Sequence, residues 1–230
     1  LHQGTQHAIN LSLYKKLPYD TVRDFAAVAY VASAPFLLVV HPSVPANSVR
    51  ELIALMKAKP DELRMASPGV GSGGHLAGVL FTTLAGVKSL HVPYKSAGLS
   101  ILAVVGNETQ WTFAPIGAPL PHVRSGRLKA LAVTPEKRTS LAPQLPTVGE
   151  AAGLPDFGVT AWMGVFGPAG MPANITASAK HDVAHRQRLM KEVPHRGVSF
   201  LLVSIARSRC EVNTVLEFFA RNAWRRPMPA

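Results

Sequence analysis

Short apolar runs alternate with helix-like segments along most of this chain, and this alternation limits the fold more than any other feature. The apolar runs, each short enough for one strand, lie at residues 36–40, 63–66, 89–92, 110–113 and 128–134. The first of them is bounded by Pro35 and Pro42, which predicts a short buried strand. Repeated strand–loop–helix units of this length are typical of parallel sheets covered by helices. We therefore predict an α/β fold with a parallel sheet.

Helix signals in the intervening segments support this prediction. The clearest helix begins at Ser48, because Ser48 and Glu51 form a capping-box pattern, and it ends before Pro60. Two further helices are predicted at 75–85 and 99–105, each followed by a glycine that ends it.

The last third of the chain is less regular. One or two helical turns are predicted at 121–125, and a proline-rich connector at 141–157 leads to a predicted strand near 159–166. A basic helix is predicted within residues 181–197.

The segment SPGVGSGGH, residues 67–75, is the most distinctive turn. It combines glycines and serines between a predicted strand and a predicted helix. Glycine permits positive φ and a close approach to a bound group, and the unpaired amides of a helix start point toward such a group. Helix N-termini favour phosphates and carboxylates alike. The loops VPYKSAG and APIGAP also follow predicted strands, so all three are expected to converge at one sheet edge.

A dinucleotide site is the main alternative for this loop. Gly69, Gly71 and Gly74 satisfy the spacing G-x-G-x-x-G between a strand and a helix. That motif also needs an acidic residue about 20 positions later to bind the ribose, and this chain has SLHVPYK there. No Gly-Lys-Ser/Thr follows the glycines, which excludes a Walker-type loop.

Catalytic and metal-binding patterns are weak. Ser67 and Ser72 lie near His75, but such pairs in a glycine-rich turn are usually hydrogen-bonding turn residues, and no G-x-S-x-G elbow is present. Cys210 is the sole cysteine, so no cysteine-based metal site is expected. The histidines of the predicted loops are spread apart, at His7, His75, His91 and His122. We therefore predict a protein without enzymatic activity, cofactor or metal ion.

The charge of the chain is strongly basic but unevenly distributed. The formal net charge is +11, of which residues 175–230 carry +6, with 10 Lys or Arg against 4 Asp or Glu. A nucleic-acid partner is therefore not expected for the body of the chain. A basic nucleic-acid-binding protein that uses this tail stays an alternative.

Several segments, taken in order, resemble one protein family over residues 3–174. They are GTQHAINLSLYKKLPYD, VPANSVRELIALMKAKPDELRMASPGVGSGGHLAGVLF, HVPYKSAG, PLPHVRSGRLKALAVT, LPTVGEAAGLPDF and AWMGVFGPAGMP. Together they resemble the Bug (TctC-like) extracytoplasmic solute receptors, the periplasmic binding components of tripartite tricarboxylate transport systems. After Lys95, at Ser96–Gly98, and again at Ala114, the chain departs from the residues that the family usually has near the ligand, so the resemblance does not specify the acid.

The resemblance implies a type II periplasmic-binding-protein fold, with two α/β lobes joined by crossover strands and the ligand enclosed between them. Residues 1–37 would be a remnant of the first lobe and residues 38–158 the complete second lobe. Residues 159–230 would return to the first lobe, with an atypical basic tail from about residue 175. The first lobe is expected to be incomplete, because the N-terminal strands of the family are not part of this sequence.

The function that the resemblance implies is the binding of a di- or tricarboxylate or an acidic amino acid for a membrane permease. A periplasmic location is expected by the same resemblance, although residues 1–10 show no signal-peptide pattern. A truncated fragment that does not bind ligand is the alternative. The expected ligand contacts are amides and hydroxyls of Ser67, Gly69, Gly71, Ser72 and Gly73, with Thr5 and His7 opposite and Tyr94 nearby.

Overall fold

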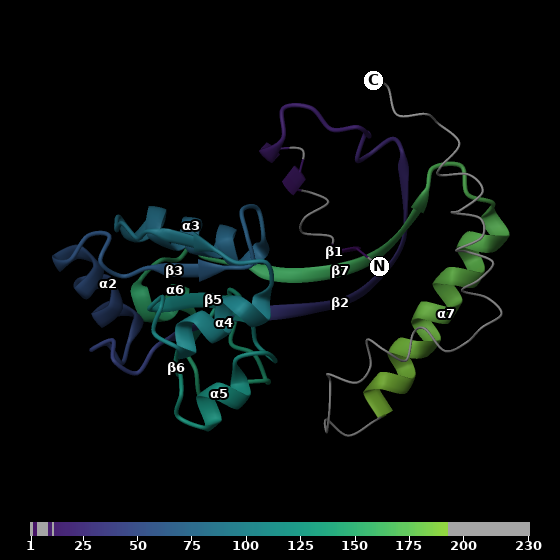
Figure 1. Ribbon diagram of the computed structural model, residues 1–230. Coiled ribbons are helices and arrows are strands. Elements are labelled where there is room, and N and C mark those ends of the chain that lie inside the picture. Colours follow the sequence, from purple (N-terminus) through teal and green to yellow (C-terminus); the bar gives the residue numbers. More distant parts are fainter. Residues whose placement is uncertain (1, 4–8, 11, 193–230) are drawn as a thin grey trace. The chain divides into compact units, whose positions relative to one another are not determined.

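The computed structural model describes residues 2–3, 9–10 and 12–192 (Figure 1). Its strands are β1 (His2–Gln3), β2 (Phe25–Val40), β3 (Met65–Ser67), β4 (His91–Pro93), β5 (Trp111–Pro115), β6 (Lys129–Val133) and β7 (Thr160–Pro168). Its helices are α2 (Val49–Ala58), α3 (Gly73–Ala85), α4 (Ala97–Val105), α5 (Leu120–Arg124), α6 (Val148–Ala152) and α7 (Ala173–Glu192). Strands and helices therefore alternate from β2 to α7, which confirms the predicted α/β character.

The chain divides into two compact units. Among the described residues, the first unit comprises those from 2 to 21 and from 29 to 165, and the second comprises 22–28 and 166–192. Strands β2 and β7 each contribute residues to both units. The lobe boundaries predicted at residues 38 and 158 stay predictions, since a lobe is defined by the ligand cleft of the whole protein.

The described strands form one mixed sheet in the order β1-β7-β2-β5-β3-β4, with β6 paired to β2. Strand β3 runs parallel to β4 and β5, so that Met65 lies opposite His91 on one side and Trp111 on the other. Strand β2 runs antiparallel to β5 and β6. The predicted parallel sheet is thus correct for β3, β4 and β5 and wrong for β2. A helix can lead into a strand of either direction, so the alternation of elements does not set the direction of β2.

Alternate residues of β2 belong to two cores on opposite faces of the sheet. Phe36, Leu38 and Val40 pack with α2, α3 and α6, while Leu37 and Val39 pack with α4. Each of these five side chains is at most 4% exposed. A strand buried on both faces reads as a continuous apolar run, as this one does.

Strand β2 is longer than predicted, because it begins at Phe25 and continues through Pro35. Proline cannot donate a hydrogen bond, but its carbonyl can still accept one. Here the Pro35 carbonyl accepts from the Ile116 N–H over 2.9 Å. Pro35 therefore lies inside the strand and does not end it.

Two helices begin with hydrogen bonds that a Ser/Thr-x-x-Glu pattern predicts. At α2, the Ser48 hydroxyl accepts from the Glu51 N–H over 3.2 Å, and the Glu51 carboxylate accepts from the Asn47 N–H over 2.7 Å. The predicted start of α2 is confirmed, although the carboxylate reaches one residue further back than in a regular capping box.

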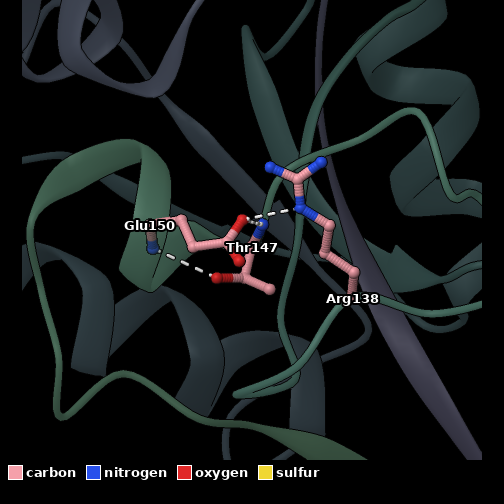
Figure 2. Close-up of polar contacts among 3 residues, drawn as sticks. All are labelled: Arg138, Thr147 and Glu150. Atoms are coloured by element: carbon pink, nitrogen blue, oxygen red, sulfur yellow. Dashed lines mark hydrogen bonds and ion pairs between the residues drawn. The ribbon is translucent and has the colours of Figure 1, made fainter.

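Helix α6 lies within the segment 141–157, for which the sequence predicts a connector, so that interpretation is wrong. Figure 2 shows the Thr147 hydroxyl accepting from the Glu150 N–H over 3.1 Å, while the Glu150 carboxylate accepts from the Thr147 N–H over 3.2 Å. The same carboxylate accepts from Arg138 Nε over 2.9 Å. The hydrogen bond from Arg138, followed by that from Thr147, lowers the pKa of Glu150.

Phe81 holds α3 against the core that contains Phe36. Its ring lies edge-on to the rings of Trp111, Phe113 and Phe157, with centroid distances of 5.8, 5.9 and 6.3 Å. Such aromatic pairs each contribute about 0.5–1.5 kcal/mol beyond the burial of their surface. The helix that follows the glycine-rich turn is therefore firmly attached to the sheet.

In the second unit, the Ala169 N–H donates to the Asp24 carbonyl over 2.9 Å. Helix α7 begins at Ala173, earlier than the predicted range 181–197, whose last residues lie outside the described part. None of the helices that the structure describes has the length and the apolar composition needed to cross a bilayer.

Candidate functional site

Residues 67–75, which we name the glycine loop, join β3 to α3. Because β3 is parallel to β4 and β5, the segments that follow these three strands lie at the same sheet edge. The Tyr94 N–H donates to the Ser67 carbonyl over 2.8 Å. A Cβ on Gly74 would lie 2.5 Å from the Phe113 carbonyl oxygen. The predicted convergence of the three strand-end loops is therefore confirmed.

The two serines of the glycine loop form hydrogen bonds within it. The Ser72 hydroxyl donates to the Gly69 carbonyl over 2.7 Å and accepts from the His75 N–H over 3.3 Å. The Ser67 hydroxyl accepts from the Gly69 N–H over 3.1 Å and lies 3.2 Å from the Gly69 carbonyl oxygen. Ser67 is fully buried and Ser72 is 6% exposed. Both hydroxyls thus stabilise the shape of the loop.

The glycines of the loop serve two different structural purposes. Gly69 has φ +119° and Gly71 has φ +78°, as expected for a tight turn. Gly73 and Gly74 begin α3 and permit close packing, since a Cβ on Gly73 would lie 2.6 Å from the Phe36 ring. Of these two properties of glycine, positive φ therefore applies to Gly69 and Gly71, and the lack of a Cβ applies to Gly73 and Gly74.

The first turn of α3 offers unpaired hydrogen-bond donors. The N–H groups of Gly73 and Gly74 have no acceptor among the described residues, as is usual for the first residues of a helix. Both glycines are buried, and the first turn contains no acidic side chain. The arrangement therefore suits an anion, which would accept from the amides and face the positive end of the helix dipole.

Two histidine rings form hydrogen bonds with the loop, one from its last residue, His75, and one from His91 on β4. His75 Nδ1 accepts from the Gly71 N–H over 3.3 Å, and His91 Nε2 lies 2.6 Å from the Ser67 hydroxyl oxygen. The ring centroids are 4.3 Å apart. Burial lowers the pKa of His75, and burial followed by the charge of His75 lowers the pKa of His91. The sequence places these histidines in separate segments, and only the pairing of β4 with β3 brings them together.

Tyr94 joins the site through its backbone. Its hydroxyl donates to the Glu108 carboxylate over 3.1 Å. Burial, followed by the hydrogen bond with Glu108, raises the pKa of Tyr94. Its side chain lines a surface cavity of about 290 Å³ together with Leu99, Leu102, Ala103, Gly106 and Glu108. The Tyr94 hydroxyl therefore forms its hydrogen bond outside the glycine loop.

The N-terminal segment contacts the glycine loop through Leu13. The Leu13 side chain, 40% exposed, fills the space that a Cβ on Gly71 would occupy. Thr5 and His7, for which the resemblance implies a place on the opposite side of the ligand, are outside the described residues.

Side chains that bind metal ions do not cluster in the described part of the chain. Among these residues, no three or more His, Cys, Asp or Glu side chains gather in a group that could hold an ion. His181 and His185 lie one turn apart on α7 with their ring centroids 6.3 Å apart, a pair that our sequence interpretation missed.

Solved structures define the class of protein to which this fold belongs. An R. palustris structure with adipate matches at TM-score 0.75 and 34% identity, over 80% of this chain and 61% of that chain. MatC from Rhodopseudomonas palustris with bound malate matches at TM-score 0.73 and 28% identity, over 94% and 74%. The periplasmic binding protein BugD matches at TM-score 0.72 and 27% identity, over 78% and 60%. The predicted class, an α/β fold of the two-lobed periplasmic-binding-protein type, is confirmed.

Sequence comparison then defines the family. A family model described as the tripartite tricarboxylate transporter family receptor, TctC, matches residues 3–192. BugT of Bordetella pertussis is 34% identical over 168 residues, 73% of this chain and 51% of BugT. A protein from the tcbD-tcbE intergenic region of Pseudomonas sp. is 33% identical over 183 residues, 80% of this chain and 54% of that protein. The chain therefore belongs to the TctC receptor family, as the resemblance predicts, and it spans about half the length of these curated relatives.

Proposed function

We propose that this chain forms part of an extracytoplasmic receptor that binds a small carboxylate in the periplasm for the membrane permease of a tripartite tricarboxylate transporter. The proposed ligand is a di- or tricarboxylate or an acidic amino acid. Membership of a receptor family supports the proposal, as do the solved relatives that contain adipate and malate.

The buried first turn of α3 is the observation that carries the proposal. An anion that accepts from Gly73 and Gly74 would give these buried N–H groups a charged partner, and hydrogen bonds to charged groups contribute about 1.5–3 kcal/mol each. The helix dipole adds about 0.3–1 kcal/mol for a negative charge at this end. A carboxylate suits these neutral donors, because hydrogen bonds to charged acceptors are stronger than neutral ones.

The residues of the proposed site have different tasks. Gly73 and Gly74 would donate to the ligand, whereas the serine hydroxyls and the N–H groups of Gly69 and Gly71 already bond within the loop and would keep it in shape. The Tyr94 backbone would fix the neighbouring loop. Thr5 and His7 are proposed to contact the ligand from the opposite side.

Isothermal titration calorimetry with adipate, malate, succinate, citrate, aspartate, glutamate and nicotinate tests this proposal. We expect at least one acid to bind. Val70 is 68% exposed in the glycine loop, so Val70→Glu places a carboxylate beside the proposed site without filling a core. Repulsion should weaken binding about fivefold. The control is Val79→Glu, which adds the same charge to an exposed position on α3 beyond the first turn. Silence with every acid, or equal effects of the two substitutions, would contradict the proposal.

A chain that folds but does not bind is the second candidate, which the partial coverage of the relatives favours. Thermal unfolding separates the two candidates. If the site is competent, a free ligand concentration of 100 times Kd adds about 2.7 kcal/mol to the apparent stability of the protein. A melting temperature that no acid raises would favour the non-binding candidate.

A further inference from the structure

The His75–His91 pair combines hydrogen bonds to the glycine loop with direct ring contact. His75 lies in the first turn of α3, and its Nδ1 accepts from the Gly71 N–H over 3.3 Å. His91 begins β4 and its Nε2 lies 2.6 Å from the Ser67 hydroxyl oxygen. The two rings, 4.3 Å apart, therefore contact the loop at two separate points.

The two histidines respond differently to a proton. An imidazole nitrogen accepts a hydrogen bond only when it carries no proton, so the bond from Gly71 requires His75 to be neutral. A protonated His91, in contrast, can donate to the Ser67 hydroxyl, which can in turn donate to the Gly69 carbonyl. Protonation of His75 therefore breaks a bond of the loop, and protonation of His91 does not.

The surroundings of the two rings disfavour their protonation. Burial lowers the pKa of His75, and the pKa of His91 is lowered by burial and then by the charge of His75. Protonation of either ring therefore requires a pH below the usual histidine pKa. No other described group shifts the pKa of either ring, although the adjoining elements carry other titratable side chains. These are Lys15, Lys16, Arg64, Lys88, Tyr94 and Lys95.

We propose that His75 makes the glycine loop pH-responsive, so that the loop binds a carboxylate while His75 is neutral and binds it weakly once His75 is protonated. This inference rests on the proposed function. The imidazolium would present an N–H to the Gly71 N–H, so the ring must turn away and leave that amide without its acceptor.

Two effects of that proton oppose each other. The positive charge attracts the anionic ligand, but a ring that has turned toward water is screened, and exposed charge pairs contribute little. The unpaired amide destabilises the bent loop that leads into Gly73 and Gly74, so fewer molecules hold the binding-competent shape, and we expect the affinity to fall by about fivefold or more. Because the pKa is lowered from 6.5, affinity should be full above pH 6.5 and should fall as the pH drops below it.

Matched variants test the inference, with malate and adipate as the probes. The test variant is His75→Asn, because its amide oxygen replaces Nδ1 as the acceptor and does not titrate. The control is His41→Asn, because His41 Nδ1 also accepts a backbone N–H, from Ser43 over 3.1 Å, at a site outside the loop. Affinities are measured from about pH 7.5 to about pH 5 in each protein, a range that spans the usual histidine pKa. Ionisation of the ligand is the same for all three proteins and cancels in their ratios.

The expected result is that the wild type and His41→Asn lose affinity at low pH relative to His75→Asn, by about fivefold or more. Parallel pH profiles for all three proteins would overturn the inference. Nuclear magnetic resonance of the ligand-free protein gives a readout that does not depend on binding. The ring nitrogens of His75 and the hydrogen exchange of the Gly71 amide should titrate together, and a Gly71 amide that ignores the His75 titration would also overturn it. If no acid binds at neutral pH, the proposed function fails, and the resonance experiment still decides the coupling.

Discussion

Replacing Gly74 with alanine has two opposing effects on the stability of the protein through helix α3. Alanine is favoured over glycine within a helix by about 1 kcal/mol. The new Cβ would, however, lie 2.5 Å from the carbonyl oxygen of Phe113. This oxygen is part of the backbone of β5, which is paired with both β2 and β3, so no side-chain rotation can relieve the contact. Overpacking costs about 1–3 kcal/mol, and at its upper end we expect a net destabilisation of about 2 kcal/mol.

Gly98→Ala provides the matched control. Gly98 is also the second residue of a helix with a serine N-cap, because α4 begins at Ala97 after Ser96. The nearest atom to a Cβ on Gly98 is the Ser96 Oγ at 3.9 Å, an ordinary contact. Here only the helix preference acts, and we expect a stabilisation of up to about 1 kcal/mol.

The free energy of unfolding of both variants is measured by urea titration. The transition is monitored by circular dichroism and by tryptophan fluorescence, to which the fully buried Trp111 contributes. With a urea m-value of about 2 kcal/mol/M, the midpoint for Gly74→Ala should fall by about 1 M. The midpoint for Gly98→Ala should rise slightly. A Gly74→Ala protein as stable as the wild type, or a shift of both variants in the same direction, would refute the packing argument.

Three further predictions use the same unfolding assay. Phe81→Ala should lose about 3–5 kcal/mol, because it removes the centre of the buried aromatic cluster, and a loss below about 1 kcal/mol would contradict that role. Gly71→Ala should destabilise by about 1–2 kcal/mol, since φ is +78° and Leu13 occupies the space of the new Cβ; an unchanged midpoint would be the contrary result. Glu150→Gln should lower stability at neutral pH. Because the folded pKa of Glu150 is lowered, the difference from the wild type should be complete above pH 4.5 and vanish as the pH falls through the lowered value; a difference independent of pH would contradict the role of Arg138.

Local signals in the sequence predict where most elements lie, but not how the strands pair. Ser48 with Glu51 locates the start of α2, and Thr147 with Glu150 carries the same signal for α6. The direction of β2 and its passage through Pro35 depend on partners far away in sequence, such as Ile116. Pairing of this kind is set by the whole sheet, so a local pattern does not contain it.

The same contrast between local sequence signals and long-range strand pairing applies to the candidate site. The position of the glycine loop follows from its composition, and its place at the start of a helix predicts a preference for anions. The contact of His75 with His91 depends on the register that places His91 opposite Met65. The direction of the Tyr94 hydroxyl toward Glu108 likewise depends on how α4 returns to the sheet. Neither arrangement has a signature in neighbouring residues.

The hydrogen bonds that Ser67 and Ser72 form within the glycine loop have a consequence for selectivity. They preorganise the loop, so that little conformational entropy remains to be lost when an anion arrives. In the proposed function, donors fixed in this way would recognise the carboxylate group that all candidate acids share. Discrimination among acids would then fall to side chains that face the rest of the ligand, and those positions could change during evolution without altering the loop proposed to bind the common group.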